Sequence, residues 1–470
     1  MTDWTVATAA EIARAVRSGS VTASTVIGSC LGKIDAHDKA IGAFTFVAHE
    51  RARARAADID ARIKRGEDPG PLAGVPFAVK NLFDVKGIAT LAGSKINRDM
   101  APASRDAVLI ERLEANGAIL VGALNMGEYA YDFTGENYHD GPSRNPHARE
   151  HMTGGSSGGS GAAAAAGFVP LTLGSDTNGS IRVPASLCGL FGLKPTYGRL
   201  SRSGSFPFVA SLDHLGPLAR SVGDLALSYN AMTGLDPSDP VCTDRIDPPV
   251  ALDPAAKLDG LRIARAGGYF EEGGHAEAFD AVARICAALD VGETREIENA
   301  GLARASAYLI TMAEGASLHL DRLKTRHADF DPDVRDRLLA GAMIPGAWVA
   351  KAQKFRSQFR AQMQAVFEQV DVLIAPATPC VAPLIGQKTF VLGGKELPVR
   401  PNLGVFTQPI SFIGLPVVTV PVWLEDSKLP IGVQIITAPW REDIALRVAA
   451  WLEGNGHASA PAATLEEKAA

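Results

Sequence analysis

Two serines in glycine-rich loops are the first residues of this sequence whose surroundings suggest chemistry. Ser156 lies in the run GGSSGGSG at 154–161, and Ser180 follows Gly179 in GSDTNGS. Glycines let a backbone approach a ligand closely, and a loop that enters a helix presents unpaired N–H groups to a developing negative charge. A serine nucleophile beside such N–H groups is what an acyl-transfer site requires.

A serine nucleophile also needs a base, and no histidine stands in an obvious position for that role. Lys80 is a better candidate because it ends an apolar run in which Phe77 and Val79 alternate as in a strand. Burial lowers the pKa of a lysine, so a neutral amine could accept a proton near pH 7. A lone lysine in such a position is more often ion-paired or extends to solvent, so both interpretations stay open.

The Gly/Ser-rich run has three alternatives. A flexible linker has this composition, but the run leads directly into an Ala-rich apolar segment that is typical of a buried helix. A phosphate-binding loop is a poor match because GxxxxGK[ST] is absent. Gly154 to Gly158 match the GxSxG nucleophile elbow, which requires a preceding strand, and the sequence NPHAREHMT at 145–153 does not predict one.

The elements that would position these side chains alternate between helix and strand, which predicts an α/β fold. A capping box at Thr8 and Glu11 predicts a first helix ending near Gly19, and Thr22 or Ser24 begins a second. Between the two serines the pattern predicts a buried helix and a short strand. Further helices are expected at 51–65, which should be solvated, and at 104–116, most of 300–370 and 443–453. Strands are expected at 75–79, 118–121, 261–265, 371–375, 417–422 and 431–436.

Two other segments allow specific expectations. Residues 125–147 are rich in turn residues and aromatics, so they either line a pocket or form a surface loop with buried rings. The tail from Gly454 onward should be frayed. Near-helical spacing places six side chains of the last long helix in the core: Trp348, Phe355, Phe359, Met363, Val366 and Val370.

The composition is that of an ordinary globular protein. The chain has 470 residues, 46% apolar and 21% charged, with a formal charge of −6, which gives no reason to expect nucleic acid or a membrane as partner. An anionic substrate would therefore need locally placed cations. The five scattered cysteines indicate reduced thiols in a cytoplasmic protein. No metal-binding spacing and no signal peptide are visible.

Several motifs together resemble the amidase signature family. They are GVPFAVKNLFDVKG around Lys80, GGSSGGS around Ser156, GSDTNGSIRVPAS around Ser180, then YGRLSRSG, FTQPISFIGLPVVTVP and LPIGVQII, so the resemblance covers nearly the whole chain. It implies a single domain over 1–470 with a large mixed, twisted sheet flanked by helices, and no cofactor or metal.

The resemblance also implies a Ser–cis-Ser–Lys triad. Ser180 would be the acyl nucleophile, Ser156 a proton relay at a cis peptide bond, and Lys80 the base. The N–H groups of Thr177, Asn178, Gly179 and Ser180 would form the oxyanion hole. Asp176 and Arg182 would form an ion pair that braces the loop, unless Arg182 contacts a substrate carboxylate instead.

One departure from the family pattern bears on the substrate. The family usually has glycine where this chain has Asn178, so Asn178, together with Tyr131, is predicted to contact the substrate. GSDTNGSIRVP and GRLSRSGSFPFVASLDHLGP are most similar to the carboxybiuret hydrolases of cyanuric acid breakdown, which implies a small anionic urea-like amide. The same resemblance is compatible with a homodimer, or with a hetero-oligomer that includes a small partner subunit.

Three rival functions remain. The A subunit of glutamyl-tRNA amidotransferase has an Asp at the place of Gly404, which counts against glutamine as the substrate here. A general aliphatic or aryl amidase is a second rival. A non-catalytic scaffold subunit belongs to a different class, and the intact Lys80, Ser156 and Ser180 argue against it.

Overall fold

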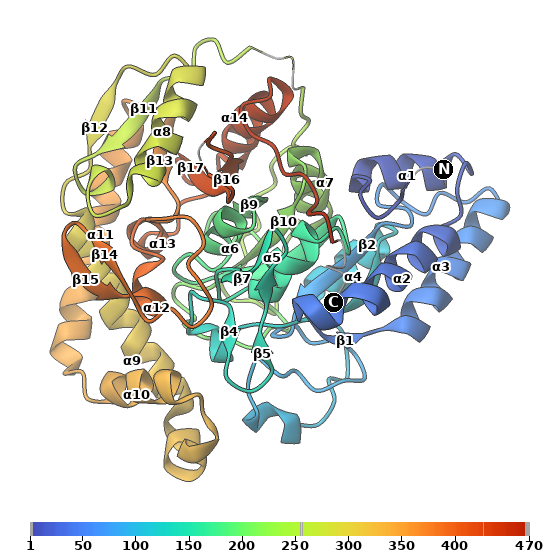
Figure 1. Ribbon diagram of the computed structural model, residues 1–470, viewed down its shortest axis with the longest axis horizontal. Coiled ribbons are helices and arrows are strands. Elements are labelled where there is room, and N and C mark those ends of the chain that lie inside the picture. Colours follow the sequence, from blue (N-terminus) through green and yellow to red (C-terminus); the bar gives the residue numbers. More distant parts are fainter. Residues whose placement is uncertain (1–2, 254, 256, 426, 466–470) are drawn as a thin grey trace.

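The computed structural model describes residues 3–253, 255, 257–425 and 427–465. Within these residues a mixed sheet of 11 strands forms the centre of the molecule, and helices flank it (Figure 1). In spatial order the strands are β1 (Phe44–Val47), β3 (Ile119–Leu124), β2 (Pro76–Lys80), β8 (Leu171–Asp176), β10 (His214–Ala219), β9 (Phe191–Lys194), β16 (Val417–Val422), β17 (Ile431–Thr437), β13 (Val372–Pro376), β11 (Ile263–Gly267) and β12 (Thr294–Glu296).

The sheet has parallel strands on both sides of an antiparallel centre. Strands β3, β2 and β8 run parallel to one another, as do β13, β11 and β12. The pairs between β8 and β13 are antiparallel. Strands such as β2 and β8 are buried at every residue, as expected where both faces are covered. The predicted α/β fold with a large mixed sheet flanked by helices is confirmed.

Nine of the described helices match predicted ones, whereas those at 182–187, 222–232, 276–288, 399–402 and 408–412 were not predicted. The helices are α1 (Ala9–Arg17), α2 (Ala23–Ile41), α3 (His49–Lys64), α4 (Val108–Ala115), α5 (Gly158–Ala165), α6 (Arg182–Leu187), α7 (Val222–Met232), α8 (Ala276–Ala288), α9 (Ala300–Arg326), α10 (Pro332–Ala342), α11 (Gly346–Phe367), α12 (Val399–Asn402), α13 (Gln408–Phe412) and α14 (Glu442–Gly454). Thr8 caps α1 through the predicted capping box, and Thr22 caps α2. In Figure 1, α9 and α10 lie at the opposite end of the molecule from α1–α3.

Short elements complete the fold. Four 3-10 helices are described: η1 (Ile96–Asp99), η2 (Glu128–Ala130), η3 (Gly268–Glu271) and η4 (His327–Asp329). Three two-stranded ribbons lie outside the main sheet and pair β4 (Glu136–Asn137) with β5 (Gly141–Pro142), β6 (Arg144–Asn145) with β7 (Ala148–Met152), and β14 (Thr389–Leu392) with β15 (Lys395–Pro398). No helix within the described ranges combines the length and hydropathy that crossing a bilayer requires.

Two predicted boundaries are wrong for local reasons. Helix α4 begins at Val108 rather than near Ser104, because the residues before it bond to neighbouring loops: Ala107 N donates to Asp84 O and Asp106 accepts from Lys86 N. The sequence before Ser156 does form a strand, β7, although none was predicted. It pairs in a ribbon outside the main sheet, unlike the strand of a nucleophile elbow.

Two burial predictions also need correction. Trp348, in the first turn of α11, is 54% exposed, whereas Phe359, Met363 and Val370 are buried as predicted. Helical spacing identifies a face but not the length over which neighbours cover it. Helix α3 is not simply solvated, since it buries Ala52, Ala56 and Ile59.

The tail after α14 is packed rather than frayed as far as it is described. Ala463 N donates to Ala165 O at the end of α5, and Ala458, Ala463 and Leu465 are buried. The tail thus satisfies a carbonyl that α5 leaves free at its C-terminus. Residues 466–470 lie outside the described residues.

Candidate active site

Two neighbouring parallel strands bring the first polar side chains together. Val79 on β2 is in register with Leu173 on β8, so Lys80 and Ser175 lie at the same edge of the sheet. Lys80 Nζ is 2.9 Å from Ser175 Oγ and 2.6 Å from Ser156 Oγ. Ser156 comes from the loop before α5, and the Gly155–Ser156 peptide bond is cis, as the resemblance implies.

Burial sets the protonation of this lysine. Lys80 has no exposed surface, and burial lowers its pKa to about 7, although Asp176, Asp213 and Asp132 act in the opposite direction. Removing a lysine from water disfavours the ammonium form. A substantial fraction of Lys80 is therefore neutral at physiological pH, which is the state that can accept a proton.

The loop between β8 and α6 is braced from within by an ion pair. Arg182 Nε lies 2.9 Å from Asp176 Oδ2, and neither side chain has exposed surface. Burial alone would raise the pKa of Asp176, but the Arg182 guanidinium holds it well below its usual range. Arg182 also donates to Gln434 Oε1 and to Thr407 O. The predicted ion pair is present, and protein groups engage this guanidinium.

Glycine is required at one position of the same loop. Gly179 has a φ of +143°, and a Cβ there would lie 2.2 Å from Thr407 Oγ1. Thr407 Oγ1 donates to Asn178 O at 2.7 Å. The Thr407 hydroxyl therefore occupies the space that a side chain at 179 would need, and it holds the loop through the Asn178 carbonyl. The neighbouring backbone N–H groups are those of the predicted oxyanion hole.

A small cavity adjoins this loop. Its volume is about 20 Å³, and such a space holds roughly one water. The lining includes the predicted site residues Tyr131, Thr177, Asn178 and Ser180, together with Ala130, Asp132, Phe133, Phe208, Tyr308, Thr311, Arg337, Pro401 and Gln408. The segment 125–147 thus contributes a pocket wall through Tyr131 and Phe133, while its Tyr138 is 65% exposed.

Two polar atoms of lining residues lack a protein partner. Asn178 Nδ2 donates to Thr311 Oγ1 at 2.8 Å, but Asn178 Oδ1 and Tyr131 Oη have no hydrogen-bond partner among the described residues. A buried polar atom without a partner is costly unless a ligand or water satisfies it. Asn178 and Tyr131 therefore each offer a polar atom that a ligand or water could satisfy, and their contact with substrate stays a prediction.

The pocket also contains a guanidinium that no motif had indicated. Arg337 on α10 donates to Tyr131 O at 2.5 Å and lies 3.9 Å from the centre of the Tyr131 ring. Its position on a helix far along the chain from both serine loops explains why spacing gave no signal. Thr311, which fixes the Asn178 carboxamide, was missed for the same reason.

Two further residues contact site residues through hydrogen bonds. Ser175 accepts from Lys80, and its place directly before Asp176 in GSDTNGS could have indicated it. Asp213 is half-buried and accepts from Thr177 Oγ1 at 2.6 Å and from Phe208 N at 2.9 Å. It therefore ties the loop between β8 and α6 to Phe208 in the wall of the pocket.

Comparison with known proteins places this geometry in a family. A family model described as Amidase matches residues 25–446. AtzE of Pseudomonas sp. (strain ADP), named as one of the subunits of 1-carboxybiuret hydrolase, is 53% identical over 448 residues, which cover 95% of this chain and 98% of that protein. The A subunit of the glutamyl-tRNA(Gln) amidotransferase from Roseiflexus sp. (strain RS-1) is 39% identical, with 94% of both chains covered.

A solved structure agrees with these relatives. It is described as a vestigial protein complex that reveals the evolutionary origins of an s-triazine catabolic enzyme. It superposes with a TM-score of 0.94 at 52% identity, covering 96% of this chain and 99% of its own. Since the matches extend over nearly the whole chain, the protein belongs to the amidase signature family and is a hydrolase of C–N amide bonds.

Proposed function

We propose that this enzyme hydrolyses a small carboxylated urea-type amide, of the 1-carboxybiuret kind, and releases ammonia through an acyl-enzyme on Ser180. The observation that carries the mechanism is the buried Lys80 amine, whose Nζ lies 2.6 Å from Ser156 Oγ. Lys80 Nζ is within donating distance of both Ser156 Oγ and Ser175 Oγ. In the neutral amine the single lone pair can accept the Ser156 proton while an N–H still donates to Ser175.

The reaction then needs no metal or cofactor. Lys80 takes the proton of Ser156, and Ser156 takes that of Ser180 as the Ser180 oxygen attacks the amide carbonyl. The N–H groups of residues 177–180 stabilise the oxyanion. Ser156 returns a proton to the leaving nitrogen, and a water activated by the same relay hydrolyses the acyl-enzyme.

The pocket supports a small anionic substrate. Arg337 supplies the local cation that a carboxylate needs in a chain of net charge −6. Asn178 Oδ1 is an acceptor for a urea-type N–H, and Tyr131 Oη is free to donate to a carbonyl oxygen. A relative of 53% identity is named for its action on 1-carboxybiuret, which supports the same class here.

Glutamine is a less suitable substrate. A Cβ at position 404 would lie 2.5 Å from Phe133 Cζ, so the Phe133 ring occupies the space that the aspartate of the amidotransferase A subunits would need. Phe133 also lines the cavity.

A small partner subunit is part of the proposal. The relative of 53% identity is itself named as a subunit, and the similar solved structure is described as a protein complex. We place the reaction in the cytoplasm, in keeping with five cysteines that are all free thiols.

Ammonia release from a substrate panel tests the proposal. With carboxybiuret, biuret, allophanate, malonamate, glutamine and an anilide, we expect the highest kcat/KM for carboxybiuret. Ser180→Ala should reduce that activity by about 10³-fold or more, whereas Ser228→Ala, a buried serine on α7, should not. A preference for glutamine or the anilide would overturn the proposed substrate class. A Ser180→Ala variant that stays active would overturn the proposed mechanism.

A further inference from the structure

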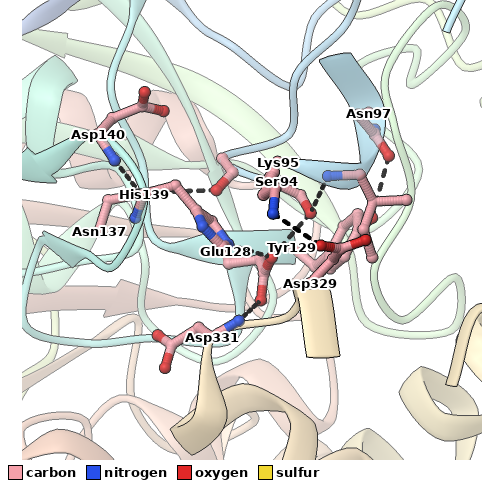
Figure 2. Close-up of polar contacts among 12 residues, drawn as sticks. Ser94, Lys95, Asn97, Glu128, Tyr129, Asn137, His139, Asp140, Asp329 and Asp331 are labelled. Atoms are coloured by element: carbon pink, nitrogen blue, oxygen red, sulfur yellow. Dashed lines mark hydrogen bonds and ion pairs between the residues drawn. The ribbon is translucent and has the colours of Figure 1, made fainter. Parts of the chain in front are cut away.

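Glu128 is a buried carboxylate that the proposed mechanism does not use. It lies on η2 and is 1% exposed. Its Oε1 accepts from Ser94 Oγ at 2.7 Å and lies 2.9 Å from His139 Nε2, while its Oε2 accepts from Asp331 N at 2.7 Å. Figure 2 shows the Glu128 side chain between His139 and Asp331. Both oxygens are therefore engaged with protein groups.

The bond to Asp331 fixes the start of the helix that carries Arg337. Asp331 is the N-cap of α10, and its Oδ1 accepts from Asp333 N at 2.9 Å. Its Oδ2 accepts from Arg400 at 2.8 Å. Glu128 holds the backbone N–H of the same residue, so the first turn of α10 is fixed through both main chain and side chain.

Glu128 also precedes the segment that carries Tyr131. Tyr129 and Ala130 have φ values of 49° and 60°, a left-handed region that is unfavourable for non-glycine residues. Surrounding contacts must hold such a bend. Tyr129 Oη donates to Asn97 Oδ1 at 3.0 Å, and Glu128 anchors the residue immediately before the bend.

These contacts form a closed ring around one side of the pocket. From Glu128 the chain leads through the bend to Tyr131, whose carbonyl and ring contact Arg337. From Arg337, α10 leads back to Asp331 and its bond with Glu128. The position of Arg337 relative to Tyr131 therefore depends on the Glu128–Asp331 bond, together with Arg400, which bridges Asp331 and Asp132. Lys80 and Ser180 lie elsewhere, on β2 and on the loop after β8.

We propose that Glu128 is a positioning residue for the substrate carboxylate, and that it acts by fixing Arg337 against Tyr131. This role rests on the proposed function. Lys80 and Ser180 are held by other elements, whereas Ser156 O accepts from Gly127 N at 3.1 Å, beside Glu128. Loss of the Glu128 bond should therefore act mainly on binding of the carboxylate, and kcat for biuret reports any effect that reaches Ser156.

Kinetics with carboxybiuret and biuret test this role, since the two differ by one carboxylate. We expect Glu128→Ala to raise KM for carboxybiuret by about tenfold or more, with kcat within about twofold and KM for biuret unchanged. Glu128→Gln should restore most of the loss, because its amide oxygen can still accept from Asp331 N and its NH₂ can face Ser94. Asp224→Ala is a matched control, a buried carboxylate that accepts from the N–H groups of Ala9 and Ala10 at the start of α1.

A second pair of variants isolates the hydrogen bond if Glu128→Ala fails to fold. Asp331→Ala and Asp331→Pro both remove the side chain, but only proline removes the N–H. The φ of −54° at Asp331 suits proline. We expect the larger rise in KM for carboxybiuret in Asp331→Pro.

The possible results separate this role from the proposed function. A wild type that hydrolyses both substrates equally well contradicts the substrate class, and with it this role. Two other results contradict the role of Glu128 but not the substrate class. In the first, the wild type prefers carboxybiuret and Glu128→Ala keeps that preference. In the second, Glu128→Ala lowers kcat equally for both substrates.

Discussion

Among single residues, Lys80 depends most directly on its surroundings, because burial moves its pKa to about 7. The proposed relay uses the neutral amine, which becomes scarce below that pKa. We therefore expect kcat/KM to fall by about tenfold per pH unit below pH 7 and to level off above it. A pH series from 5 to 9 with carboxybiuret measures this limb, and a rate constant that is level across the series would rule out Lys80 as the titrating base.

The sequence indicated some residues of the site and not others, for a physical reason. Lys80, Ser156 and Ser180 sit in motifs whose glycines and apolar neighbours are local in the chain. Arg337 and Thr311 reach the pocket only through the packing of α9 and α10. Asn178 was indicated by its departure from a family pattern, and its partner Thr311 depends on tertiary structure.

At the scale of elements, the loop between β8 and α6 depends on the buried Asp176–Arg182 pair. Removing one partner of a buried pair leaves an uncompensated charge, which costs about 3–5 kcal/mol. We expect Arg182→Met to lower the free energy of unfolding by that amount in chemical denaturation, and to abolish activity through the displaced loop.

A surface pair provides the control for this prediction. Arg262 pairs with Asp371 at 2.9 Å, but its side chain is 49% exposed, so Arg262→Met should change the denaturation midpoint little. Equal effects of the two substitutions would mean that burial of the Asp176–Arg182 pair has no special importance for the loop.

Most elements were predictable because helix caps and apolar periodicity are local signals. The capping box of α1 and the strand at β2 are examples. The errors occurred where distant groups decide the outcome. Loop contacts delay the start of α4, and residues 383–385 bond to the backbone of β7 in addition to its local partner β6.

At the scale of the whole molecule, the order of strands in the sheet could not be predicted from local sequence patterns. Strand β9 lies between β10 and β16 although more than 200 residues separate Lys194 from Val417.

The two terminal helices of the chain also meet on α7. Asp224 of α7 accepts from the N–H groups of Ala9 and Ala10 at the start of α1, and Glu453 of α14 accepts from Val222 N at 3.1 Å.

This junction of helices should make stability depend on pH. Burial raises the pKa of Glu453 from 4.5 to about 7 and that of Asp224 from 3.8 to about 6. A carboxyl whose pKa is higher in the folded than in the unfolded state binds more protons when folded, so its contribution to stability is complete below the unfolded pKa and is lost as pH rises through the folded pKa. For Glu453 this window runs from about pH 4.5 to about pH 7.

Glu453→Gln removes the titration but keeps an oxygen that can accept from Val222 N. We expect the variant to gain stability relative to the wild type as pH rises from 5 to 8, measured as the difference in denaturation midpoint at each pH. Some carboxylates have a pKa that shifts in the opposite direction, such as Asp176, whose pKa is lowered. Their contributions to the pH dependence of stability are the same in both proteins and cancel in the difference. A difference that stays constant across this range would show that Glu453 does not titrate at the junction, and that the ends of the chain are joined by packing and neutral hydrogen bonds alone.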